Sequence, residues 1–389
     1  MKKFTDFPLL ESKKKSFPLF YPYISKKSLK SINTVLKSRW IGQGPLVDIL
    51  EEKFKKKFAK TNYCLAVGSG TDALHLAYIL SNFKKGDEVI APVFTCTATN
   101  IPLLYQNIKI KFADIDLDTM NISLKHVQKL ITKKTKAIIF VNYGGIPCDL
   151  KKLNELSKKY NLILIQDAAQ SLGSTYNKKD ITSFADFTIF SFQAIKHITS
   201  GDGGMLTFKN KKILEKSRRI RWFGIDRIKK QGGTWENDIK EIGYKYQMTD
   251  IGARLLLDSI QDYKKIINHR KKIFNIYKKN LNKNSFVQIL DTKNKQYTNS
   301  YWLCTIIVKK DRVKLQNYLR NFNIETNQVH FRNDRYSIFK KFIKKDAYPN
   351  MDLLEDRYLV IPLNPQISTT DAKFISKKIN DFFIKYAQL

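Results

Sequence analysis

Short apolar runs alternate with amphipathic stretches over the first two thirds of the chain. The runs have the length of buried strands and are bounded by turn residues, whereas the stretches between them repeat apolar positions at helical spacing. Strands joined by helices need crossover connections, so this pattern predicts a mostly parallel sheet. The expected strands lie at 64–70, 86–92, 108–116, 135–145, 161–170, 184–192 and 203–208, and the expected helices at 46–60, 71–80, 97–106 and 150–160.

The pattern changes near residue 250. A long helical stretch at 251–281, straight or bent, precedes a strand at 301–308 and helices at 312–322 and 372–386. A chain of 389 residues is too long for one small core. We therefore expect an N-terminal arm at 1–45, a large α/β domain at 46–255 and a smaller α+β domain at 256–389.

Several polar residues follow the expected strands, at the edge where open parallel sheets bind ligands. The turn GSGT at 68–71 opens a helix, and helix N-termini bind anions. Asp167 ends the run LILIQ, where a carboxylate is either a helix cap or the partner of a buried cation. Ser191 ends another strand and could hold a phosphate, although a serine there could equally bond the backbone. The turn alone could also be a simple connector.

Lys196 follows the strand FTIFSF and lies among apolar neighbours. Burying a lysine costs free energy unless it is paired or its pKa falls, and a lysine of lowered pKa is a nucleophile for Schiff-base chemistry. The alternative is a lysine whose stem is buried and whose amine reaches water. An anion cradle, a carboxylate and an imine-forming amine together match the needs of pyridoxal 5'-phosphate (PLP).

The chain resembles the DegT/DnrJ/EryC1/StrS sugar aminotransferases. The resemblance runs in family order across nearly the whole chain, and QDAAQ followed by SFxxxKxxxxGDGG is its most specific part. The other matching segments are GQGPLVDILEEKF, VGSGTDALHLA, GDEVIAPVFT, TKAIIFVNYGG, GYKYQMTDIGA and NIETNQVHF. This resemblance implies the aspartate-aminotransferase fold type I, with a large domain built on a mostly parallel sheet of the seven-stranded type and a smaller C-terminal α+β domain. It also implies a homodimer with shared active sites.

The resemblance assigns roles residue by residue. Lys196 matches the PLP lysine, Asp167 the carboxylate at the pyridine nitrogen, and Gln170 the glutamine near the ring hydroxyl. The phosphate cradle falls on Gly70, Thr71 and Ser191. Two positions depart from the commoner family pattern: Cys96 stands where a ring-stacking aromatic is frequent, and Lys245 stands where an asparagine from the other subunit usually contacts the phosphate. A lysine can still meet a phosphate as a point charge.

The resemblance also bears on the substrate. The residues HITSGDGG at 197–204 look like the turn of members that aminate C4, which implies a nucleoside-diphosphate 4-keto-6-deoxyhexose with L-glutamate as donor. Two alternatives keep the enzyme: amination at C3 of a nucleotide sugar, or amination of a keto-cyclitol or a small phosphorylated ketone. A third is a regulatory or binding protein with a vestigial PLP site. A dehydratase branch carries histidine in place of the lysine, and Lys196 argues against it. His330 and Arg332 are expected to touch the sugar or diphosphate; otherwise both are ordinary surface residues.

The net charge of +35 has two readings. It could attract a polyanion or an anionic substrate, or it could reflect a composition rich in lysine. Arginine is scarce among the basic residues and the lysines are dispersed, so we expect no nucleic-acid partner. No stretch has the length of a membrane span, and the four cysteines have no metal spacing, so we expect no membrane partner, no metal, and a reducing, cytoplasmic location.

Overall fold

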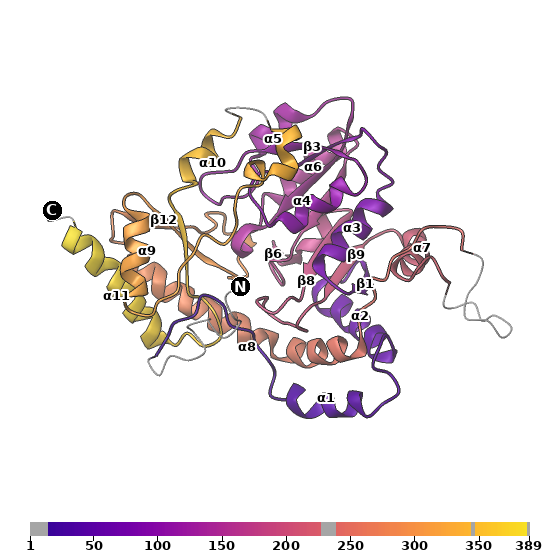
Figure 1. Ribbon diagram of the computed structural model, residues 1–389, viewed down its shortest axis with the longest axis horizontal. Helices are drawn as coiled ribbons and strands as arrows, with labels where there is room; N and C mark the ends of the chain where they lie inside the picture. Colours follow the sequence, from indigo (N-terminus) through magenta and orange to yellow (C-terminus); the bar gives the residue numbers. More distant parts are fainter. Residues whose placement is uncertain (1–14, 227–238, 344–346, 387–389) are drawn as a thin grey trace.

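A computed structural model describes residues 15–226, 239–343 and 347–386, which form a sheet-centred body and a smaller lobe (Figure 1). The main sheet has seven strands in the order β1-β9-β8-β5-β4-β2-β3. All neighbours are parallel except β9, which is antiparallel to both β1 and β8. The strands are β1 (Tyr63–Val67), β2 (Glu88–Pro92), β3 (Lys109–Ala113), β4 (Thr135–Val141), β5 (Ile163–Asp167), β8 (Phe187–Ser191) and β9 (Gly204–Phe208).

Both faces of this sheet are buried. Along β1, Leu65 and Val67 belong to one apolar cluster, whereas Cys64 and Ala66 belong to another. Burial of alternate side chains on opposite faces explains why the strands are almost continuously apolar. The helices of this part of the chain are α1 (Ser28–Leu36), α2 (Pro45–Phe58), α3 (Gly70–Leu80), α4 (Thr97–Leu104), α5 (Leu124–Leu130), α6 (Leu150–Lys159) and α7 (Lys211–Arg221).

The smaller lobe is built on a second, antiparallel sheet with its own apolar core. Its strand order is β10-β12-β13, and helices α9 and α11 lie beside it (Figure 1). Its elements are β10 (Val287–Ile289), β12 (Cys304–Val308), α9 (Arg312–Arg320), β13 (Tyr358–Ile361) and α11 (Thr369–Tyr386), whereas α10 (Pro349–Leu354) packs in a cluster of the large sheet. A small third sheet joins β6 (Thr175–Tyr176), β7 (Lys179–Asp180) and β11 (Tyr297–Thr298), and short 3-10 turns are η2 (Tyr143–Gly145), η3 (Ile181–Phe184), η4 (Asn333–Arg335) and η5 (Ser337–Phe342).

Helix α8 (Asp250–Leu281) connects the two parts as one continuous helix of 32 residues. Its start is capped by Thr249, whose side chain accepts a hydrogen bond from the Gly252 N–H. Leu256 near its beginning packs in a large-sheet cluster, whereas Phe274 near its end packs in the core of the small lobe. The expected domain boundary at 255/256 falls inside this helix, and the domain limits stay a prediction.

The predicted alternation of strands and helices and the mostly parallel sheet are confirmed. The sequence interpretation did not anticipate the antiparallel direction of β9 or the elements α5, α7, β10 and β13. The expected arm at 1–45 is described only from residue 15 onward, where it includes α1. Within the described ranges, no helix is both long and apolar enough to cross a membrane.

Candidate active site

The antiparallel strand β9 lies between the two strands that carry the predicted phosphate cradle. Gly204 on β9 is aligned with Val67 on one side and Ser191 on the other. A Cβ atom at Gly204 would lie 2.3 Å from the Ser69 carbonyl oxygen. Glycine is therefore required here, because it lets the start of α3 lie directly over the sheet edge.

The first residues of α3 then come against the end of β8. A Cβ atom at Gly70 would lie 2.8 Å from the Ser191 Cβ and 3.2 Å from its hydroxyl oxygen. Ser69 caps the helix by accepting a hydrogen bond from the Asp72 N–H. The N–H groups of a first helical turn have no partner within the helix, and they carry the positive end of its dipole. Gly70, its neighbour Thr71 and Ser191 thus lie together at the positive end of α3, where an anion is attracted.

Asp167 ends β5, the parallel neighbour of β8, and its side chain is buried. Its carboxylate accepts hydrogen bonds from the Thr99 hydroxyl at 2.7 Å and from the Ala169 N–H at 3.0 Å. Burial raises the pKa of this carboxyl, while Ala169, Thr99 and the nearby Lys196 amine oppose that rise. These partners favour an ionised carboxylate in an apolar setting, as a counter-charge for a buried cation requires.

Lys196 lies in the turn that follows β8, and its amine is close to both Asp167 and Cys96. Burial lowers the pKa of Lys196 to about 8, and the two neighbours act in the opposite direction. Its Nζ lies 4.1 Å from the centroid of the Trp302 ring. About a tenth of this amine is therefore neutral and nucleophilic at pH 7, far more than for an ordinary surface lysine.

Gln170 joins the large sheet to the small lobe. Its Oε1 accepts a hydrogen bond from the Gly144 N–H at 2.7 Å, and its Nε2 lies 2.9 Å from the His330 Nε2. An amide nitrogen can only donate, so the His330 Nε2 is the acceptor and carries no proton. Burial, followed by the nearby Lys196, lowers the pKa of His330 to about 3. His330 is therefore neutral and is held beside Lys196.

The remaining candidates lie at the margin. Cys96 is exposed immediately before α4, within electrostatic range of Lys196. Lys245 is exposed, and its Nζ lies 5.7 Å from the centroid of the Trp222 ring. His197, the neighbour of Lys196, is buried, and its Nε2 forms a hydrogen bond of 2.8 Å with the Ser300 carbonyl oxygen, so its ring binds the backbone.

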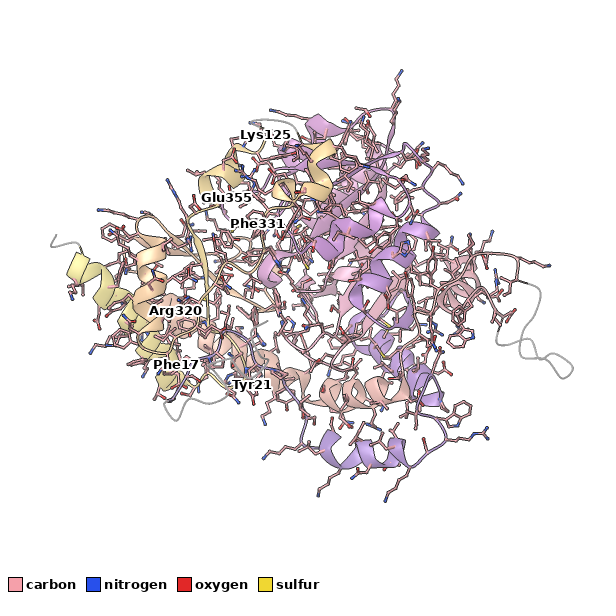
Figure 2. All side chains as sticks on the ribbon, viewed as in Figure 1. Phe17, Tyr21, Lys125, Arg320, Phe331 and Glu355 are labelled. Atoms are coloured by element: carbon pink, nitrogen blue, oxygen red, sulfur yellow. The ribbon has the colours of Figure 1, made fainter. Side chains whose placement is uncertain are left out.

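Arg332 forms ion pairs with carboxylates of its own chain. Its guanidinium is buried and makes ion pairs with Asp334 at 2.7 Å and Glu355 at 2.9 Å, and another with Asp352. Figure 2 labels Glu355 together with Phe331, the exposed residue between His330 and Arg332. Sequence position alone suggested a ligand contact or a surface residue. The structure instead gives this arginine a structural role, because carboxylates from residues 334–355 satisfy its donors.

Two side chains at the site were missed by the sequence interpretation. Thr99 bonds Asp167 from the first turn of α4, and Trp302 lies under the Lys196 amine from the loop before β12. Thr99 follows Cys96 by three residues, a spacing that could have placed both on one helical face. Nothing in the local pattern around Trp302 distinguishes it from a core tryptophan.

The residues present fit PLP. The close approach of Gly70 to Ser191 sets the serine hydroxyl beside the first N–H groups of α3, and these are donors that a phosphate can use. Lys196 is an amine of lowered pKa, and Asp167 is a buried acceptor supported by two donors. An imine-forming amine, a counter-ion for a ring nitrogen and a phosphate site are the functional groups that this cofactor requires.

Comparisons with known proteins agree with this chemistry. The model of the DegT/DnrJ/EryC1/StrS aminotransferase family matches residues 22–380. The chain is 32% identical to the GDP-perosamine synthase of Escherichia coli O157:H7, over 95% of this chain and 99% of that protein. It is 29% identical to the UDP-4-amino-4,6-dideoxy-N-acetyl-beta-L-altrosamine transaminase of Campylobacter jejuni, over 90% of this chain and 93% of that protein.

A solved structure extends the comparison to the fold. The PLP form of the sugar aminotransferase Spr1654 from Streptococcus pneumoniae is similar to this chain with a TM-score of 0.87 and 27% identity. The match covers 95% of this chain and 99% of that one, and a PMP form of the same protein matches with a TM-score of 0.88. The chain therefore belongs to the DegT/DnrJ/EryC1/StrS aminotransferase family and is a PLP-dependent aminotransferase of fold type I.

Proposed function

We propose that this enzyme transfers the amino group of L-glutamate to C4 of a nucleoside-diphosphate 4-keto-6-deoxyhexose, for the synthesis of a surface polysaccharide or glycan. The observation that carries the proposal is the presence of Lys196, an amine with its pKa lowered to about 8, within electrostatic range of the buried Asp167 carboxylate. The substrate is supported by the two curated relatives, whose names refer to nucleotide-linked sugars and, in one case, to a 4-amino sugar.

Each residue has a defined task in this proposal. PLP, when bound, supplies the electron sink for breaking a C–H bond next to nitrogen. Lys196 would hold the cofactor and then carry a proton on Nζ between two carbons. Asp167 would keep the ring nitrogen protonated, and Gly70, Thr71 and Ser191 would hold the phosphate. Gln170 would lie near the ring hydroxyl and Cys96 near the ring face, while the neutral His330 stays our candidate for a contact with the sugar or diphosphate.

The experiment is a substrate panel. Purified enzyme is incubated with L-glutamate and matched 3-keto and 4-keto nucleotide sugars, a keto-cyclitol and a small phosphorylated ketone, and the new amine is located by mass spectrometry and NMR. We expect an amine at C4 of the nucleotide sugar only. An amine at C3 alone, or on a ketone without a nucleotide, would reject the proposed substrate while leaving the aminotransferase chemistry in place.

The role of Lys196 has a separate test. Lys196→Ala should lose the absorbance band near 420 nm that borohydride removes in the parent enzyme, together with nearly all turnover. Lys209→Ala is a matched control, because burial also lowers the pKa of Lys209 but its Nζ bonds the Ser183 carbonyl oxygen away from the site. A Lys196→Ala enzyme with the parent rate would show that another group carries the cofactor.

We also propose a homodimer in which Lys245 reaches the phosphate site of the other copy. Support comes from the family pattern and from the exposure of Lys245 on its own chain. Lys196→Ala and Lys245→Ala are mixed under conditions that exchange subunits. If each site takes residues from both copies, mixed dimers regain one intact site and measurable activity. Sedimentation as a fully active monomer, or no recovery in exchanged dimers, would contradict this arrangement. A cytoplasmic location remains a prediction.

A further inference from the structure

Trp302 makes a direct contact with the side chain at the centre of the proposed chemistry. The Lys196 Nζ lies over the indole, 4.1 Å from the ring centroid. A cation above an aromatic face is attracted by the ring quadrupole, most strongly by tryptophan and most where water is excluded. The indole here is only 2% exposed, so the contact belongs to the interior.

Hydrogen bonds hold both the indole and the backbone of Trp302. Its Nε1 donates a hydrogen bond at 3.1 Å to the carbonyl oxygen of Ile195, the residue immediately before Lys196. The Trp302 N–H donates to the Gly144 carbonyl oxygen at 3.0 Å, and the Trp302 carbonyl oxygen accepts from the Arg270 guanidinium at 3.2 Å. The ring therefore binds both the amine of Lys196 and the peptide that carries it.

Gly144 extends this arrangement to the rest of the site. Its carbonyl oxygen accepts from Trp302, and its N–H donates to Gln170, which in turn contacts His330. The indole of Trp302 thus contacts Lys196, and its backbone is connected through Gly144 to Gln170 and His330. The connection links the small lobe, which supplies Trp302, to the strand ends of the large sheet.

We propose that Trp302 is a positioning residue that holds the free amine of Lys196 over its indole face and fixes the turn that bears it. A lysine has a flexible four-carbon stem, and an amine that would carry a proton between two carbons gains from a confined resting place. This inference rests on the proposed role of Lys196. The groups that also face the amine are Asp167, Cys96, His197 and His330.

The test measures the amine in the apoenzyme, without turnover. PLP is removed and the rate of its recombination is followed by absorbance from pH 6 to 10, because only the neutral amine reacts. An aromatic face favours the ammonium form, so its loss should lower the pH midpoint. We expect Trp302→Leu to lower the midpoint by about one pH unit, and Trp302→Phe by less. The value of kcat should fall about tenfold in the leucine variant.

Trp40→Leu is the matched control, because it removes an exposed tryptophan whose ring lies 5.4 Å from the Arg39 guanidinium. Its midpoint should equal that of the parent. An unchanged or raised midpoint in folded Trp302→Leu would overturn the proposal, and if that variant does not fold, the phenylalanine variant decides by the same criterion. The Lys196→Ala apoenzyme should not recombine with PLP. If it did, the role of Lys196 would be rejected, and not that of Trp302.

Discussion

Removal of the Thr99 hydroxyl should shift the acid limb of the pH–rate profile. Thr99→Val keeps nearly the same shape but deletes the donor that bonds the Asp167 carboxylate at 2.7 Å. A hydrogen bond to a charged group contributes about 1.5–3 kcal/mol, and about 1.4 kcal/mol corresponds to one pKa unit. The pKa of Asp167, which burial already raises, should therefore rise by about 1 to 2 further units.

The sign follows from which form is active. An ionised Asp167 is needed to pair with a protonated ring nitrogen, so activity is present above its pKa and is lost as the pH falls through it. A higher pKa moves that loss to higher pH. The assay is kcat/KM against pH for the parent, Thr99→Val and Thr99→Ser, which restores the hydroxyl and should restore the profile.

Thr207→Val separates this effect from general destabilisation. Thr207 is also buried, and its hydroxyl bonds the Thr188 carbonyl oxygen at 3.2 Å within the sheet. Its variant should lose some stability without moving the acid limb. An acid limb that stays in place in a folded, PLP-loaded Thr99→Val enzyme would refute the idea that this hydroxyl sets the charge of Asp167.

Three further outcomes are expected. Gly70→Ala should weaken PLP binding at least about tenfold in an apoenzyme titration, because the new Cβ would lie 2.8 Å from the Ser191 Cβ. Gly42→Ala is the control and should leave PLP binding unchanged, because no atom lies within 4 Å of its Cβ. Arg221→Met should lower the free energy of unfolding in urea by about 3–5 kcal/mol, because it leaves the buried Glu51 without the ion pair at 2.8 Å. The dependence of kcat on pH should show no transition near pH 6.5 from His330, because the pKa of this residue is lowered to about 3. His330→Gln should therefore leave the acid and alkaline limbs of that profile at the same pH.

Residues at the ends of strands could be placed from the sequence because the strand pattern is local. An apolar run followed by Asp167 or Lys196 indicates a sheet edge, and parallel neighbours bring such residues together. The direction of β9 could not be predicted, since GMLTF is apolar in either orientation. Its antiparallel placement is nevertheless what brings Gly204 under the start of α3.

Contacts between distant segments were beyond the sequence pattern. The ion pairs of Arg332 depend on a fold that returns Asp352 and Glu355 to its side. Trp302 reaches Lys196 from more than a hundred residues away, and only the packed structure distinguishes it from an ordinary core residue. Local periodicity carries no information about such pairs.

The shared helix α8 has a consequence for the order in which the enzyme is completed during synthesis. Its first half can pack on the large sheet as soon as it leaves the ribosome, but its second half belongs to a core made by later residues. Arg270, near the middle of α8, stays without the Trp302 carbonyl oxygen until that later part has emerged. A nascent chain that ends before residue 302 therefore lacks the indole over which the Lys196 amine lies, so the arrangement around this lysine is complete only once the small lobe has been made.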